Sequence, residues 1–155
     1  MIKETVYKNV QLSQVARRLN ITIESVHKIW NAYEDYIRDK IQNGYSVKFL
    51  NVCYFRVDGR TVEFHETMAY VATEIANKLN ISKEIAYRVL LSFEEYLIDD
   101  LRNFYSYCVR GLLKIWLQKV EDGSYRIRSS KSTIYDGYDV RVVILSGFKR
   151  KVEIY

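Results

Sequence analysis

The chain has 155 residues, of which 48% are hydrophobic and 28% charged, a composition typical of one compact domain or two small ones. Twenty-four Lys and Arg against 19 Asp and Glu give a net charge of +5, which permits contact with nucleic acid without requiring it. Two Cys exclude a disulfide scaffold and a Cys-only zinc site. No apolar run approaches the roughly 20 residues of a membrane span, and the opening residues are too polar for a signal peptide. We therefore expect a cytoplasmic protein without a membrane partner.

The chain repeats itself at an offset of sixty residues. Between residues 16–46 and 76–106, 11 of the 31 aligned pairs are identical and no gap is needed. The identities include Asn20 with Asn80 and Tyr36 with Tyr96. Self-similarity at a fixed offset is typical of a duplicated structural unit. We therefore predict two tandem units, residues 1–64 and 65–155, joined too closely to move independently.

Each unit opens with two predicted helices. Apolar residues spaced at i, i+3, i+4 and i+7 indicate a short helix that ends at Asn20 or Asn80, because Asn tolerates the left-handed conformation. Thr22 and Ser82 are expected to cap a second helix of about twenty residues. Its apolar stripe is the expected core: Val26, Ile29, Trp30, Tyr33, Ile37 and Ile41 in the first unit, and Ala86, Val89, Leu90, Phe93, Leu97 and Leu101 in the second.

After the helices the apolar period changes to two, which predicts strands. In the first unit the strand region covers residues 45–57, Asp58-Gly59 is a turn signal, and residues 60–64 are expected to return as a strand. In the second unit, strands are expected over residues 105–109, 113–120 and 140–145, and residues 149–155 also alternate. The second unit therefore has a long β-arm over residues 119–141, whereas the arm of the first unit is truncated.

This order of elements resembles the HU and integration-host-factor (IHF) family. The family pattern Ala-x3-(Gly/Asn)-(Leu/Ile)-(Ser/Thr) is matched by residues 16–22 and again by residues 76–82. The family's first-strand signature is matched by Val47, Phe49, Val52, Phe55 and Val57, and in the second unit by Val109, Gly111, Leu112, Ile115 and Leu117. The resemblance implies an α+β fold, in which two tandem HU/IHF-like units, each with two helices and an arm-bearing sheet, pack as an intrachain pseudo-dimer.

The chain departs from the family in its arms. Family members are dimers whose two arms embrace DNA and insert a Pro between base pairs, and this chain has no Pro. Its single long arm carries five basic and four acidic residues, a net charge of +1. A DNA clamp would need a strongly basic arm, since phosphate neutralisation supplies most of the affinity.

Two functions therefore stay open. The first is a non-enzymatic structural protein, a component of a phage virion or other nucleoprotein assembly, that binds neighbouring protein subunits through its β-arm as part of an oligomer. The alternative is an architectural double-stranded-DNA-binding protein of the HU/IHF type. Under both, the candidate contact residues are Lys119, Tyr125, Arg126, Arg128, Lys131, Tyr135 and Arg141 in the arm, and the basic C-terminal cluster of Lys149, Arg150 and Lys151.

No residue pattern indicates an enzyme, a metal, a cofactor or a small-molecule substrate. His27 and His65 are far apart in the sequence, and neither Cys53 nor Cys108 has a partner base beside it. The paired carboxylates at residues 34–35, 94–95 and 99–100 lie outside the apolar stripes. We interpret them as solvent-exposed residues that form ion pairs with basic residues one helical turn away. Tyrosines outside the stripes suit an interface.

Overall fold

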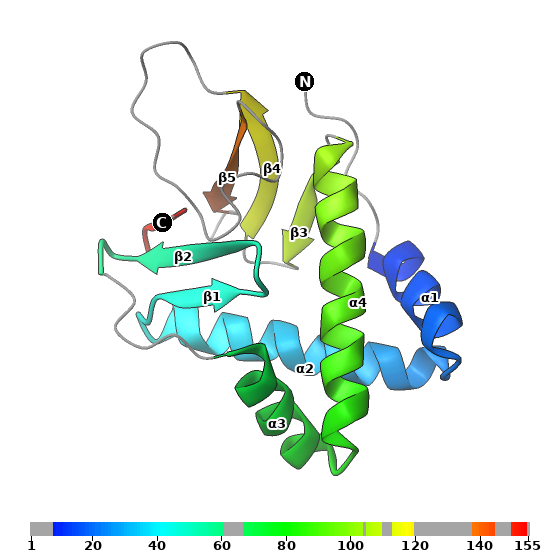
Figure 1. The fold of residues 1–155 in the computed structure, drawn as a ribbon. Helices are drawn as coiled ribbons and strands as arrows, with labels where there is room; N and C mark the ends of the chain where they lie inside the picture. Colours follow the sequence, from blue (N-terminus) through cyan, green and yellow to red (C-terminus); the bar gives the residue numbers. More distant parts are fainter. Residues whose placement is uncertain are drawn as a thin grey trace.

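The computed structural model describes residues 8–60, 67–103, 105–109, 113–119, 138–144 and 150–154. Figure 1 shows the fold of this part of the chain. Its helices are α1 (Lys8–Leu19), α2 (Ile23–Gln42), α3 (Met68–Leu79) and α4 (Lys83–Arg102). Its strands are β1 (Val47–Phe49), β2 (Cys53–Val57), β3 (Tyr107–Val109), β4 (Leu113–Lys119), β5 (Tyr138–Ile144) and β6 (Val152–Ile154). The α+β fold class is confirmed.

The predicted helices and their ends are confirmed. Both helices of the first unit recur sixty residues later in the second unit with the same lengths, and we call the two units the first and the second copy. Asn20 and Asn80 follow the short helices with φ values of 55° and 56°, the left-handed conformation expected of them. The Thr22 hydroxyl accepts a hydrogen bond from the Ser25 N–H at 3.2 Å and caps α2. Ser82 takes the same position before α4 but makes no such bond.

The long helices of both copies contribute to one hydrophobic core. All the residues expected along the apolar stripes of α2 and α4 are buried in the same cluster. Figure 1 shows the two helices crossing, with the strands gathered beside them. At the contact, the ring of Trp30 stacks on that of Phe93, with centroids 3.5 Å apart. Aromatic pairs of this kind add to the stabilisation from burial alone.

Two buried carboxylates lie at the crossing of the copies, and here the expectation of solvent-exposed ion pairs is wrong. Glu34 in α2 and Glu94 in α4 occupy equivalent positions and are only 4% and 6% exposed. Glu34 accepts a hydrogen bond from the Tyr107 hydroxyl of β3 at 3.1 Å, and Glu94 accepts one from the Asn51 side chain at 3.0 Å. Each carboxylate is thus bonded by a residue of the other copy, because the β1–β2 turn of the first copy and β3 of the second each reach the long helix of the other copy.

The strands form two antiparallel sheets, with the orders β1-β2-β6 and β3-β4-β5. Phe55 of β2 pairs with Ile154, and Ile115, sixty residues after Phe55, pairs with Val142. Therefore β6 occupies the position in the first sheet that β5 occupies in the second. The strand expected over residues 60–64 is not found at Arg60, which lies in no strand, and residues 61–66 lie outside the described part.

Candidate partner-binding surface

Each sheet has one face packed on the core and a second face directed away from it. Along β2, Cys53, Phe55 and Val57 are buried, whereas Tyr54 and Arg56 between them are partly exposed. Strand β4 alternates in the same way, since successive strand residues point to opposite faces. Strands β5 and β6 lie side by side, so that the two sheets adjoin. We call the outward side chains of the two adjoining sheets together the platform: Lys48, Tyr54, Arg56, Glu153, Lys114, Trp116 and Val143.

The platform combines aromatic rings with cations. Arg56 is paired with Glu153 of β6 at 3.2 Å, so its charge is partly neutralised. Lys114 lies opposite Val143, a side chain 45% exposed, in the β4–β5 ladder. Partly exposed aromatic and basic groups suit a protein interface and also the phosphates of a nucleic acid. The alternation of the strands could have identified these residues in the sequence.

The base of the predicted arm is an antiparallel hairpin. Strands β4 and β5 pair from Leu113↔Ile144 to Lys119↔Tyr138, and Arg141 lies opposite Trp116. The backbones of Lys119 and Arg141, the two ends of the predicted arm, are thereby placed at the edge of the platform. The other predicted arm residues lie outside the described residues: Tyr125, Arg126, Arg128, Lys131 and Tyr135.

The net positive charge of the chain is concentrated in its C-terminal third. Residues 103–155 contain ten Lys and Arg against five Asp and Glu, whereas residues 1–102 contain fourteen of each. The segment with β3, β4, the arm, β5 and β6 thus carries the whole +5, and the segment with all four helices is neutral. This positive charge would attract an anionic partner to the part of the protein formed by residues 103–155.

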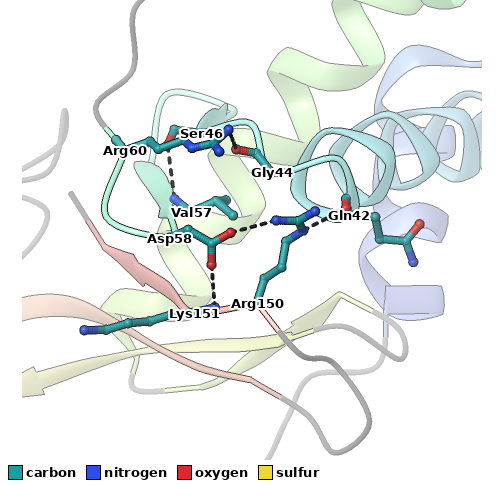
Figure 2. A network of polar contacts seen from close by, with 8 residues as sticks. All are labelled: Gln42, Gly44, Ser46, Val57, Asp58, Arg60, Arg150 and Lys151. Atoms are coloured by element: carbon teal, nitrogen blue, oxygen red, sulfur yellow. Dashed lines mark hydrogen bonds and ion pairs between the residues drawn. The ribbon is translucent and has the colours of Figure 1, made fainter.

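In the basic C-terminal cluster, Arg150 is a structural residue. Figure 2 shows its guanidinium between Asp58 and the end of α2. It donates hydrogen bonds to the Asp58 carboxylate at 2.7 Å and to the Gln42 carbonyl at 2.8 Å. The Asp58 carboxylate also accepts the Lys151 N–H at 3.2 Å. Arg150 therefore fastens β6 to the first sheet, while the Lys151 side chain is exposed and Lys149 lies outside the described residues.

The surroundings of Asp58 and Gly44 depend on this arrangement. The hydrogen bond from Arg150 lowers the pKa of the Asp58 carboxyl below its ordinary value, which keeps it ionised. Gly44 has a φ of 80°, and a Cβ there would approach the Arg150 side chain to 2.9 Å. A larger residue at position 44 would therefore disturb both the backbone and the Arg150 contact.

The cysteines and histidines show no arrangement for chemistry in the described part. Cys53 is fully buried in β2, and burial raises the pKa of its thiol. Cys108 in β3 is partly buried, which also raises its thiol pKa and opposes formation of the reactive thiolate. His27 lies partly buried in α2, and His65 is outside the described ranges. Among the described residues, no three His, Cys, Asp or Glu side chains gather where they could hold a metal ion.

Comparisons with known proteins leave the chain without an assigned relative. No protein-family model, curated protein or solved structure matches it. None of the helices in the described ranges is long and apolar enough to cross a membrane. Its function must therefore be inferred from its own residues.

Proposed function

We propose that the protein is a non-enzymatic assembly protein with an HU/IHF-like tandem fold, in which the two copies pack as an intrachain pseudo-dimer. The observation that carries this proposal is the reciprocal bonding of Glu34 by Tyr107 and of Glu94 by Asn51. Each bond joins the helix of one copy to the strand region of the other, as expected of two interlocked subunits fused into one chain. The matching positions of β5 and β6 support the same interpretation.

The proposed partners are neighbouring protein subunits, such as those of a virion or nucleoprotein assembly, bound by the platform and the arm. A DNA clamp of this family needs two arms. In the first sheet, the edge of β2 next to the Asp58-Gly59 turn is paired with β6 instead, from Val57↔Val152 to Phe55↔Ile154. The ladder position from which a first arm would extend is therefore occupied. The aromatic residues Tyr54 and Trp116 suit a protein interface, in which such side chains supply contact area at small entropic cost.

Duplex DNA is the second candidate partner, and the charge distribution favours it. The whole net charge of +5 lies in residues 103–155, which include Lys114 of the platform and the arm sequence. Binding by phosphate neutralisation weakens steeply with salt, by about 0.9 log units of affinity per log unit of salt for each contact. Salt dependence therefore distinguishes this function from protein assembly.

Two variants test the proposal. Deletion of residues 124–135 removes the sequence between the strands of the arm without touching the described core. Under the assembly proposal, this variant stays folded by circular dichroism but no longer co-purifies with or assembles into its complex. Retained assembly by the folded variant would show that the arm is not the contact element.

Replacement of Arg126, Arg128 and Lys131 by Ala tests the DNA alternative. A titration with a fluorescent DNA duplex at several salt concentrations would then show weaker binding and a shallower salt dependence. A matched control replaces three exposed helical cations, Arg17, Lys28 and Lys83, and should leave the slope unchanged. Equal effects of the two triple variants on DNA affinity would indicate unspecific attraction to net charge. Tight binding at physiological salt that is lost in the arm variant would make DNA the main partner.

A further inference from the structure

The short helix of each copy packs on the long helix of the other, but the two contacts differ. At the contact of α1 with α4, Gln11 donates a hydrogen bond to the Asp100 carboxylate at 2.5 Å. Arg18 forms an ion pair with Glu95, and its guanidinium lies 5.8 Å from the centre of the Tyr96 ring. This contact is thus closed by a guanidinium placed between a carboxylate and a tyrosine ring.

The equivalent contact of α3 with α2 is open. Sixty residues from Gln11, the side chain of Val71 cannot donate a hydrogen bond, and the counterpart of Arg18 is Lys78. A cavity of about 430 Å³ lies between the two helices, lined on the α3 side by Glu74, Ile75 and Lys78. Asp35 and Tyr36, the counterparts of Glu95 and Tyr96, line it from α2. We call this cavity the α2/α3 groove.

The groove contains polar groups without partners. Among the described residues, Glu74 and Lys78 form no ion pair with each other or with any neighbour. Asp35 is bonded only to Arg38 of its own helix, at 3.4 Å. The hydroxyl of Tyr36 is buried and has no hydrogen-bond partner.

We propose that the α2/α3 groove binds an arginine side chain of a partner protein. The guanidinium would pair with Glu74 and Asp35 beside Tyr36, as Arg18 pairs with Glu95 beside Tyr96 in the equivalent contact on α4. Carboxylates outnumber cations among the lining residues, by Asp35, Asp39 and Glu74 to Arg38 and Lys78. Arginine fits better than lysine, because its planar group donates in several directions at once.

This inference adds a contact surface to the proposed function and does not involve the arm. All the lining residues belong to α2 and α3, so the arm deletion and the groove variants give independent results. Lys78 distinguishes a cationic guest from an anionic one. Its ammonium opposes an incoming guanidinium but would attract a carboxylate, so that Lys78→Ala strengthens binding of the first and weakens binding of the second.

The test is an NMR titration of the isotope-labelled full chain with N-acetyl-arginine amide at millimolar concentration. Its neutral analogue, N-acetyl-citrulline amide, and its lysine analogue are titrated in parallel. We expect arginine-specific shifts confined to residues of α2 and α3. Loss of one partly exposed ion pair corresponds to an increase in Kd of about two- to fivefold for Glu74→Gln, and Lys78→Ala should lower Kd. Glu84→Gln, an exposed carboxylate paired with Arg88 in α4, is the matched control and should change nothing.

Three results would overturn the proposal. The first is the absence of shifts in α2 and α3, and the second is equal shifts with the citrulline analogue. The third is weaker binding after Lys78→Ala, which would identify the guest as an anion. Each variant is checked for unchanged resonances in the sheets, so that a folding defect is not mistaken for lost binding.

Discussion

The indole of Trp30 lies almost parallel to the ring of Phe93, at an interplanar angle of 18°, and its N–H donates a hydrogen bond to the Tyr107 hydroxyl at 2.9 Å. Trp30 of the first copy therefore contacts both α4 and β3 of the second copy. Trp30→Ala removes this contact and leaves a cavity in the shared core. We expect a loss of about 3–5 kcal/mol in the free energy of unfolding. Chemical denaturation should show one transition for both copies, and two separate transitions would show that the copies fold independently.

The Tyr107 hydroxyl is predicted to stabilise the buried carboxylate of Glu34. Tyr107→Phe keeps the ring and removes the O–H that donates to Glu34 and accepts from Trp30. Buried polar groups deprived of a partner cost about 1–3 kcal/mol, and we expect a loss of that size in urea denaturation. Tyr87→Phe on the exposed side of α4 is the control. A similar effect of both substitutions would contradict a specific role for the bond.

Stability should decline at alkaline pH through the buried tyrosines. Burial raises the pKa of Tyr33 and of Tyr107 above the ordinary value. The folded state therefore keeps these protons at a pH where the unfolded chain loses them, so their contribution is fully present below about pH 10 and is lost as the pH rises further. Absorbance at 295 nm and circular dichroism should show that these groups ionise together with unfolding. Ionisation of all tyrosines before unfolding would contradict the prediction.

The attachment of β6 is predicted to weaken in acid. The lowered pKa of Asp58 means that its contribution is present above the ordinary carboxyl pKa of about 4 and is lost as the pH falls through the folded-state pKa. Asp58→Asn removes the charge, and Asn tolerates the φ of 51° at this position. The variant should lower the Tm at pH 6 and change it little at pH 2.

The control for this prediction is Asp35→Asn, an exposed aspartate bonded only within its own helix. It should leave hydrogen exchange of the β6 amides unchanged, whereas Asp58→Asn should accelerate it. Unchanged exchange in both variants would show that Arg150 does not fasten the strand.

Much of the helical fold could be predicted because its determinants are local. The Asn20 and Asn80 turns, the caps and the apolar stripes each depend on residues within one or two helical turns. The sequence interpretation of Glu34 and Glu94 as solvent-exposed residues is wrong. The apolar stripe of a helix identifies only the face that packs against the hydrophobic core, and other faces can also be buried. The two carboxylates are bonded by Tyr107 and Asn51, which are far away from them in the sequence.

The candidate contact surfaces were harder to predict, for the same reason. Alternation indicated that residues 149–155 are extended, and β6 confirms this for Val152–Ile154. No local signal, however, identified β2 as its partner, or the bonds of Arg150 to Asp58 and Gln42. The α2/α3 groove depends on how closely two helices pack, and this follows from several residues such as Val71 and Lys78 together.

The position of β6 also determines when the first sheet can form. Val152 pairs with Val57, ninety-five residues earlier in the chain. During synthesis from the N-terminus, α1, α2, β1 and β2 leave the ribosome long before this partner strand exists. The edge of β2 is then an open template for pairing with other chains. Closing such a long loop is slow, so nascent chains should depend on chaperones until residues 152–154 emerge and pair with β2.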